Sequence, residues 1–326
     1  MNLLKLTKNL LILLIITAFS AYFSACSENS VEENQTDDEF IKEVVTTGIG
    51  SSQQEDDDLM SNESYDLDNG GPVGSNGGGD TPIDSLFKWG RRITSTSVTV
   101  TITSEGDSIK NAIIERTING VFHIIGYVNG NLDSIQKPYT EVLRRKAVFK
   151  RIAYTPRPRF NWRLYKVSMV DGGTTAPQNS NDYVQMQQIQ VYVNNVLEYT
   201  FQGPDFTQNI FTTRRFNGSG IPEINIGDQV RIVVSTYSTQ SEQDIVAWHW
   251  ARNTFGFHRE PFVMTSQVPS GSGWDRIYEK TFTIYPQHRI GRFNGFISAS
   301  THKSLYDDSP VEFASDLAGA PYRVLP

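Results

Sequence analysis

The sequence predicts an all-β protein, and three observations support this fold class. Aromatic residues make up 11% of the 326 residues, and aromatic side chains fit the pleated, half-buried surface of a sheet. Apolar and polar residues alternate with the period of a strand, for example at Val98, Val100 and Ile102. No convincing amphipathic helix lies between successive strand segments, which excludes alternating βαβ units and favours antiparallel sheets.

The first half of the predicted body, residues 80–170, is expected to be an antiparallel β module with one short helix. Thr81 is a typical helix N-cap, Pro82 suits the first helical position, and Gly90 is expected to end the helix. Asn119-Gly120 and Asn129-Gly130 are both typical hairpin turns. The strands predicted around these turns span residues 98–102, 109–118, 121–128, 147–154 and 162–170.

The second half, residues 183–326, is predicted to be a separate β-sandwich. Residues 171–182 are rich in Gly, Pro, Asn and Ser and form the expected internal boundary. Asn194-Asn195 predicts a turn, and Gly227-Asp228 precedes a strand with Val230, Ile232 and Val234 on one face. This second pattern resembles a strand region of immunoglobulin-like sandwiches. The predicted architecture is therefore an antiparallel β-rich module followed by an immunoglobulin-like β-sandwich, preceded by a disordered tether.

The N-terminus has the pattern of an export signal. Lys5 and Lys8 precede an apolar run over residues 10–19, which is too short to span a bilayer because spanning takes about twenty apolar residues. The run leads to Ser24-Ala25-Cys26, which resembles the lipobox of bacterial lipoproteins. The resemblance implies cleavage of a signal peptide, residues 1–25, and lipidation of Cys26, so that the partner of the mature N-terminus is a membrane. The alternative is an ordinary signal peptide with an incidental cysteine.

The resemblance to lipoproteins also implies a location. Ser27 follows the cysteine, whereas an aspartate there favours the inner membrane in enteric-type bacteria. Glu28, Glu32 and Glu33 resemble the acidic export signals of surface lipoproteins of the Bacteroidetes type. We therefore expect the protein to be anchored to the outer membrane, at the cell surface or else facing the periplasm.

Residues 26–79 are predicted to be a disordered acidic tether that ends in a Gly-rich stretch. Residues 27–85 contain 16 acidic side chains and one basic one, whereas residues 86–326 carry a net charge of +6. A segment of this composition buries too little apolar area to offset its chain entropy. The alternative is that the acidic tether folds back onto basic surface of the body.

The sequence contains no motif for a catalytic, metal or cofactor site. The five histidines lack zinc-ligand spacing, and no Gly-x-Ser-x-Gly, phosphate-loop or dinucleotide motif occurs. We therefore expect no cofactor, no metal and no enzymatic activity. A hydrolase would need two convergent carboxylates, for which the candidates are Glu198, Asp205, Glu260 and Asp275.

Two clusters are candidates for ligand binding. Residues 137–166 hold ten basic side chains and one acidic one, with aromatics between them. In an exported protein this favours an anionic glycan, lipopolysaccharide phosphate or the protein's own tether as partner, and not nucleic acid. The alternative to a binding site is that the basic side chains form one solvent-facing strand face while the aromatic residues lie in the core. The residues singled out in this cluster are Arg144, Arg145, Arg157 and Arg159.

The second cluster is aromatic. Trp248 and Trp250 are two residues apart and share one strand face, and Trp274 follows in the chain. If exposed, these rings form a platform for sugar rings or a partner protein. If buried, they belong to the sandwich core.

Together these observations predict a non-enzymatic, lipid-anchored envelope or surface protein with a binding or structural role. Carbohydrate is one candidate ligand. A protein–protein scaffold or an adhesion component of the outer membrane, bound to another envelope protein, is the first alternative. An extracellular hydrolase is the second.

Overall fold

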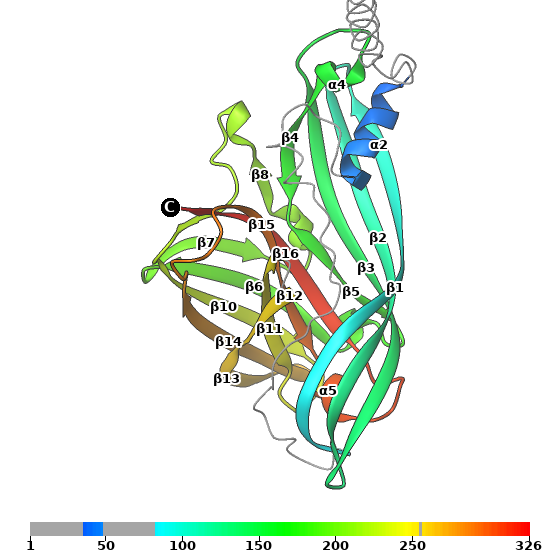
Figure 1. Ribbon diagram of the computed structural model, residues 1–326, viewed down its shortest axis with the longest axis vertical. Helices are drawn as coiled ribbons and strands as arrows, with labels where there is room; N and C mark the ends of the chain where they lie inside the picture. Colours follow the sequence, from blue (N-terminus) through cyan, green and yellow to red (C-terminus); the bar gives the residue numbers. More distant parts are fainter. Residues whose placement is uncertain (1–34, 48–81, 254–255) are drawn as a thin grey trace, which may run out of the picture.

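The computed structural model describes residues 35–47, 82–253 and 256–326, and among these it leaves the side chains of residues 250–253 and 256–258 undescribed. This part of the chain is all-β and sandwich-like, with one large curved sheet and one smaller sheet facing part of it (Figure 1). The predicted fold class is confirmed at this level, whereas the comparison with immunoglobulin-like domains stays a prediction. Among the described residues, no helix has the length and apolar character needed to cross a membrane.

The large sheet has eleven strands, and its main path runs β1-β2-β3-β5-β16-β15-β11-β12. Strand β4 pairs with β3 and β8, and β9 runs parallel to β16, whereas the other pairs in the sheet are antiparallel. The strands are β1 Ile83–Glu105, β2 Ile109–Val128, β3 Asn131–Arg151, β4 Trp162–Ser168, β5 Val170–Ala176, β8 Ile210–Thr212, β9 Glu223–Asn225, β11 Ile245–Asn253, β12 Gly256–Pro261, β15 Gly291–Ser300 and β16 Ser315–Leu325.

The smaller sheet has five antiparallel strands in the order β13-β14-β10-β6-β7. Its strands are β6 Val184–Val193, β7 Val196–Gln202, β10 Gln229–Ser238, β13 Val263–Ser270 and β14 Gly273–Thr283. The helical segments are α2 Asp37–Thr47, α4 Pro158–Asn161, α5 His302–Tyr306, η2 Ser180–Asp182, η3 Phe206–Gln208 and η4 Arg214–Phe216.

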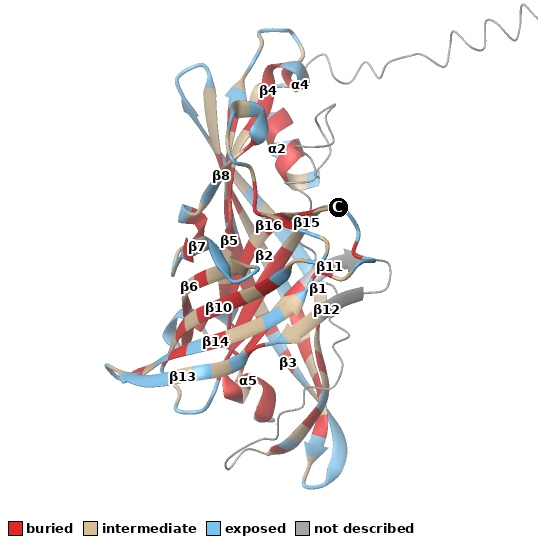
Figure 2. Cartoon of the chain, turned by 90° about the vertical axis from the view of Figure 1, so that its left-hand side faces the viewer, coloured by how far each residue is buried: buried red, intermediate tan, exposed pale blue. Residues whose placement is uncertain are grey.

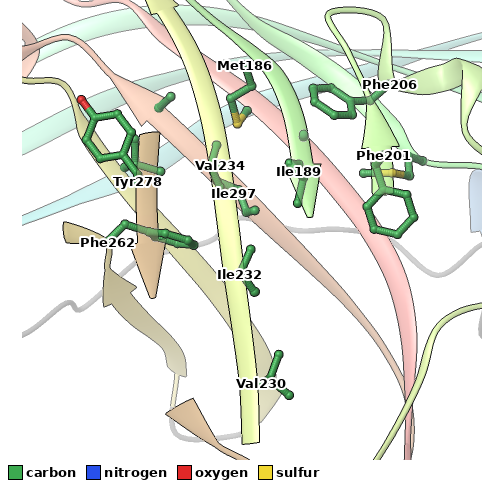
Figure 3. Close-up of a cluster of buried hydrophobic side chains, with 14 of the residues drawn as sticks. Met186, Ile189, Phe201, Phe206, Val230, Ile232, Val234, Phe262, Tyr278 and Ile297 are labelled. Atoms are coloured by element: carbon green, nitrogen blue, oxygen red, sulfur yellow. The ribbon is translucent and has the colours of Figure 1, made fainter. Parts of the chain in front are cut away.

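The core between the two sheets follows from strand alternation. Val230, Ile232 and Val234 of β10 are all buried on one face, as the sequence predicts, and they belong to the same core cluster as Ile297 of β15 (Figure 3). The predicted turn at Asn194-Asn195 is also confirmed, because both residues have positive φ angles between β6 and β7.

Strands β1, β2 and β3 form a long ribbon that extends beyond the smaller sheet at both ends (Figure 1). At about 3.3 Å per residue, the 21 residues of β3 span about 70 Å. The β2–β3 hairpin turns at Asn129-Gly130, where both residues have positive φ angles, so this predicted turn is confirmed.

The hairpin predicted at Asn119-Gly120 is wrong, because β2 continues through these residues without turning. Gly120 lies directly opposite Tyr139 of β3, and a Cβ atom on Gly120 would lie 2.5 Å from the Tyr139 ring. The glycine therefore leaves space for a cross-strand aromatic ring and does not mark a turn.

The helix predicted from Thr81 to Gly90 is also wrong, because this segment begins β1. The buried residues Ile83, Leu86 and Trp89 are three apart, which is a helical spacing. The pairing of β1 with β2 is irregular between Ile83 and Ser85 and again between Leu86 and Lys88. Each irregularity adds one residue to β1, so that inward-facing side chains here are three residues apart and not two.

The predicted boundary at residues 171–182 contributes strand β5 to the middle of the large sheet, between β3 and β16. Gly172 is needed there because a Cβ atom would lie 2.1 Å from the Val142 carbonyl oxygen. The two predicted modules therefore share one continuous sheet.

The prediction of disorder is wrong for part of the tether, because residues 37–47 form helix α2. Glu39 accepts a hydrogen bond from the Thr36 N–H (2.7 Å) and its own N–H donates to the Thr36 hydroxyl, which is a capping box. The apolar face of α2 is buried against the upper part of the ribbon (Figure 2). Asp37 and Asp38 form ion pairs with Arg151 and Lys110. This part of the acidic segment thus folds back onto basic surface, whereas residues 26–34 and 48–79 lie outside the described residues.

Candidate anion-binding site

Three hollows in the described part of the chain are candidates for a site. One lies between the sheets, has an apolar lining that includes Trp248, His288 and Tyr322, and measures about 70 Å³. The second has a mixed lining of apolar and charged side chains and measures about 200 Å³, and the third has a mainly polar lining and measures about 180 Å³. Pockets for drug-sized ligands have about 300–1,000 Å³. The second and third hollows are therefore of a size to hold one chemical group of a larger ligand.

The hollow of about 200 Å³ is lined by four arginines, and we call it the four-arginine pocket. Its arginines are Arg214, Arg215, Arg292 and Arg323, and Glu223 is the acidic residue among its lining side chains. These five side chains give the pocket a net formal charge of +3. An anion is the complementary ligand.

Three adjacent strands position one wall of the four-arginine pocket. Arg292 of β15 lies directly opposite Arg323 of β16, which in turn lies opposite Glu223 of β9. Like charges directly opposite each other are unfavourable in a sheet, and Glu223 supplies a negative charge beside Arg323. The neighbouring residues in the strands, Tyr322 and Ile224, line the hollow between the sheets on the other face.

A tight turn positions the other two arginines. The turn η4 places Arg214 and Arg215 after β8, and it ends at Asn217 with a positive φ of 61°. The Gly218 N–H donates to the Thr213 carbonyl (3.2 Å), and a Cβ atom on Gly218 would lie 2.1 Å from the Thr212 carbonyl oxygen. Only glycine fits this approach, which holds the turn against the end of β8.

One carboxylate serves two of the guanidinium groups. Glu223 accepts from Arg214, and its second oxygen lies 3.4 Å from Arg323. The Glu223 side chain is only 19% exposed, whereas that of Arg214 is 56% exposed. Glu223 therefore orders the wall of the pocket and leaves an excess of positive charge facing solvent.

Basic residues next to the pocket extend this positive surface. Lys166 of β4 lies directly opposite Thr212 of β8 in the sheet, and Thr212 lines the pocket. The Lys166 ammonium group lies 4.9 Å from the Tyr165 ring centre. Lys150 lies 5.6 Å from the ring centre of Phe216 in η4. Guanidinium groups bind phosphate, sulfate and carboxylate through paired hydrogen bonds, and flanking cations strengthen the attraction for a polyanion.

The arginines singled out in the sequence do not converge on one site. Arg144 is exposed and pairs with Glu115 at 2.9 Å. Arg145 is buried and donates to the Ser168 carbonyl (3.1 Å). Arg157 and Arg159 are half-buried at the end of the ribbon, where Arg157 is the N-cap residue of α4 and Arg159 lies within this helix. The basic run is therefore distributed over several surfaces.

The predicted tryptophan platform is not assembled by the described side chains. Trp248 is half-buried, its ring centre lies 6.0 Å from that of Tyr322, and a Cβ atom on Gly295 would lie 2.3 Å from its ring. Trp274 is half-buried on β14, in the smaller sheet. The Trp250 side chain lies outside the described residues, as does Cys26.

The four-arginine pocket was missed because its residues come from four separate segments. Arg292 and Arg323 become neighbours only when β15 pairs with β16, a strand that the sequence analysis did not predict. The one local signal is the pair Arg214-Arg215 before Asn217-Gly218, a basic pair followed by a turn.

The hollow of about 180 Å³ contains two perturbed carboxyl groups, Asp171 and Asp316. Burial raises the pKa of Asp316 to about 8, and the Met186 N–H, which donates to it at 2.7 Å, opposes this shift. Burial also raises the pKa of Asp171, to about 6. The pairing of β5 with β16 places Asp171 and Asp316 diagonally across the two strands, a position at which Cα atoms are about 7–8 Å apart. Asp205, one of the carboxylates considered in the sequence, lies close enough to raise the pKa of Asp171 further.

Within the described ranges, no group of three or more His, Cys, Asp or Glu side chains is arranged to hold a metal ion. Comparison of the sequence with models of known protein families gives no match. Comparison with curated proteins gives no significant match either.

Proposed function

We propose that this chain is a non-enzymatic, lipid-anchored protein of the outer membrane that binds an anionic group of an envelope glycan in the four-arginine pocket. The observation that supports this most directly is the charge of the lining, which has four arginines and a single carboxylate, that of Glu223. A phosphate, sulfate or carboxylate group is the ligand that this positive lining favours, because guanidinium groups bind such groups through paired hydrogen bonds.

The size of the pocket limits what it binds. About 200 Å³ accommodates one charged group with part of a sugar ring, and the rest of a glycan would lie on the surface outside. Lys150 and Lys166 lie beside the pocket, where they are placed to meet further negative groups along the chain. The proposed ligand class is therefore an acidic or phosphorylated glycan, not a neutral one.

A binding experiment with the full chain tests this proposal. Titration calorimetry would compare inorganic phosphate, a panel of acidic glycans and matched neutral glycans. We expect binding of the acidic ligands, and at least a tenfold loss, or about 1.4 kcal/mol, in Arg292→Gln. Arg231→Gln is the matched control, since Arg231 pairs with Glu279 in the smaller sheet, away from the pocket.

Equal affinities for acidic and neutral glycans, or an equal loss in both variants, would remove the anion-binding proposal. A scaffold role would remain if neither class binds and the full chain instead captures a defined envelope protein. Lipidation is tested separately, by the mass of the mature N-terminal peptide, which is expected to begin at Cys26 and carry acyl chains.

A hydrolase is the second candidate, favoured by the carboxyl groups of Asp171 and Asp316. Their separated pKa values, about 6 and about 8, resemble the arrangement in which one carboxyl group donates a proton while the other is ionised. Release of reducing sugar from a glycan panel, abolished in both Asp171→Asn and Asp316→Asn, would favour this function. Undetectable turnover across the panel would leave the carboxyl pair with a structural role.

A further inference from the structure

The end of the long ribbon beside α2 carries an exposed apolar surface. After β3, residues 152–157 form a loop that leads into the short helix α4, and we call residues 152–160 the tip. Tyr154 is 77% exposed, Ile152 is 45% exposed and Phe160 is 38% exposed. A group of exposed large apolar side chains at one end of a molecule is typical of a surface that contacts a partner or a membrane.

The tip holds these side chains in an ordered loop. The Thr155 N–H donates to the Asn161 side-chain oxygen (2.7 Å), and the Asn161 amide donates back to the Thr155 carbonyl (2.9 Å). The Ile152 N–H donates to the Asn161 backbone carbonyl (2.6 Å). Exposure of the tip therefore belongs to a fixed conformation.

Cations accompany the exposed rings. The Arg151 guanidinium lies 4.9 Å from the Tyr154 ring centre, and that of Arg159 lies 4.9 Å from the Phe160 ring centre. Exposed aromatic rings suit the interface of a bilayer, where they enter the boundary between headgroups and acyl chains. Glu105 and Asp107, in the neighbouring β1–β2 turn, add negative charge, so apolar insertion and not net charge is the driving force.

The chain also connects this end of the ribbon to the proposed lipid anchor. Helix α2 packs beside the tip, and its Asp37 pairs with Arg151 at the end of β3. About ten residues lie between Cys26 and Thr36, and such a segment reaches at most about 35 Å. The opposite end of the ribbon, at Leu132, is about 70 Å from the tip by the length of β3.

From this placement we propose that the tip rests on the bilayer that holds the lipid anchor, with Ile152, Tyr154 and Phe160 inserted at its surface. The inference rests on the proposed lipidation of Cys26. It adds a fixed orientation: the ribbon end beside α2 faces the membrane, and the β2–β3 hairpin points away from it.

The orientation is tested with the lipidated full chain in vesicles of phosphatidylcholine and phosphatidylglycerol. Cys26 is the only cysteine, so Tyr154→Cys and Leu132→Cys each leave one reactive thiol when Cys26 carries lipid. A polarity-sensitive fluorophore at position 154 is expected to be quenched by nitroxide lipids. The same fluorophore at position 132 is expected to be quenched by aqueous iodide only. Equal exposure of both positions to iodide would overturn the orientation.

The number of fluorophores bound per chain distinguishes a missing lipid anchor from a tip that does not touch the membrane. Two labels per chain would show that Cys26 is not lipidated, which contradicts the anchor. Contact by the tip is then measured with the Cys26→Ser full chain by co-sedimentation with the same vesicles. We expect Tyr154→Ser/Phe160→Ser to weaken partitioning about tenfold, or about 1.4 kcal/mol. The control Leu132→Ser/Val263→Ser removes two side chains that are 58% and 67% exposed elsewhere, and an equal loss there would refute insertion of the tip.

Discussion

Asp316 connects the two sheets through one buried carboxyl group, and its ionisation is expected to control stability. It lies on β16 of the large sheet and accepts from the Met186 N–H of β6 in the smaller one (2.7 Å). Burial raises its pKa to about 8, compared with about 3.9 for an aspartate in an unfolded chain.

The sign of the pH dependence follows from these two values. Between about pH 4 and pH 8, the folded protein holds a proton on Asp316 that the unfolded chain has lost. The contribution of Asp316 to the free energy of unfolding is therefore at its full value below about pH 4 and is lost as the pH rises through about 8. A difference of about four pKa units, at about 1.4 kcal/mol for each, corresponds to about 6 kcal/mol in all, of which about 5 kcal/mol is lost between about pH 4 and pH 8.

Asp316→Asn is the variant that isolates this effect. Asparagine keeps a carbonyl oxygen that can accept from the Met186 N–H, and it cannot ionise. Both proteins are expected to lose stability between about pH 4 and pH 8. We expect the loss in the free energy of unfolding to be about 5 kcal/mol smaller in the variant than in the wild type. Urea unfolding at a series of pH values, with unchanged m-values, measures this difference.

Two comparisons make the result decisive. Asp171 and Asp244, whose pKa values burial raises to about 6, contribute in the same pH range, so the difference between the two curves is the relevant quantity. Asp316→Ala also removes the acceptor for Met186 and is expected to lower stability at every pH. Parallel curves for the wild type and Asp316→Asn would refute the reasoning.

Three further predictions concern packing and charge. Asp244→Ala is expected to cost about 3–5 kcal/mol in urea unfolding, because it leaves the fully buried Arg276 without its carboxylate partner; Arg144→Ala, which breaks an exposed pair, is expected to cost at most about 1 kcal/mol. Gly120→Ala is expected to cost about 1–3 kcal/mol by overpacking, and a double-mutant cycle with Tyr139→Leu would recover much of this cost if contact with the ring is the cause. Ile41→Ala is expected to weaken docking of α2 by about 2–5 kcal/mol, seen as faster proteolysis within residues 37–47 with an unchanged β-sheet circular dichroism spectrum.

The sequence by itself determined the fold class and much of the local structure. Alternation placed Val230, Ile232 and Val234 on one buried face, and the Asn-Gly and Asn-Asn turns at residues 129–130 and 194–195 formed as expected because both residues of each turn need positive φ angles. These features depend on residues that are close together in the chain.

Only the tertiary structure decided which segments meet. Asn119-Gly120 has the same two residue types as the turn at Asn129-Gly130. Its glycine instead lies within β2, where the absence of a side chain leaves room for the ring of Tyr139 on the neighbouring strand. Arg292 and Arg323 form a site because β15 pairs with β16 in one particular register. A shift of that register by one residue would move either arginine to the other face. Local sequence specifies strands and turns, whereas their long-range pairing brings the charged groups together.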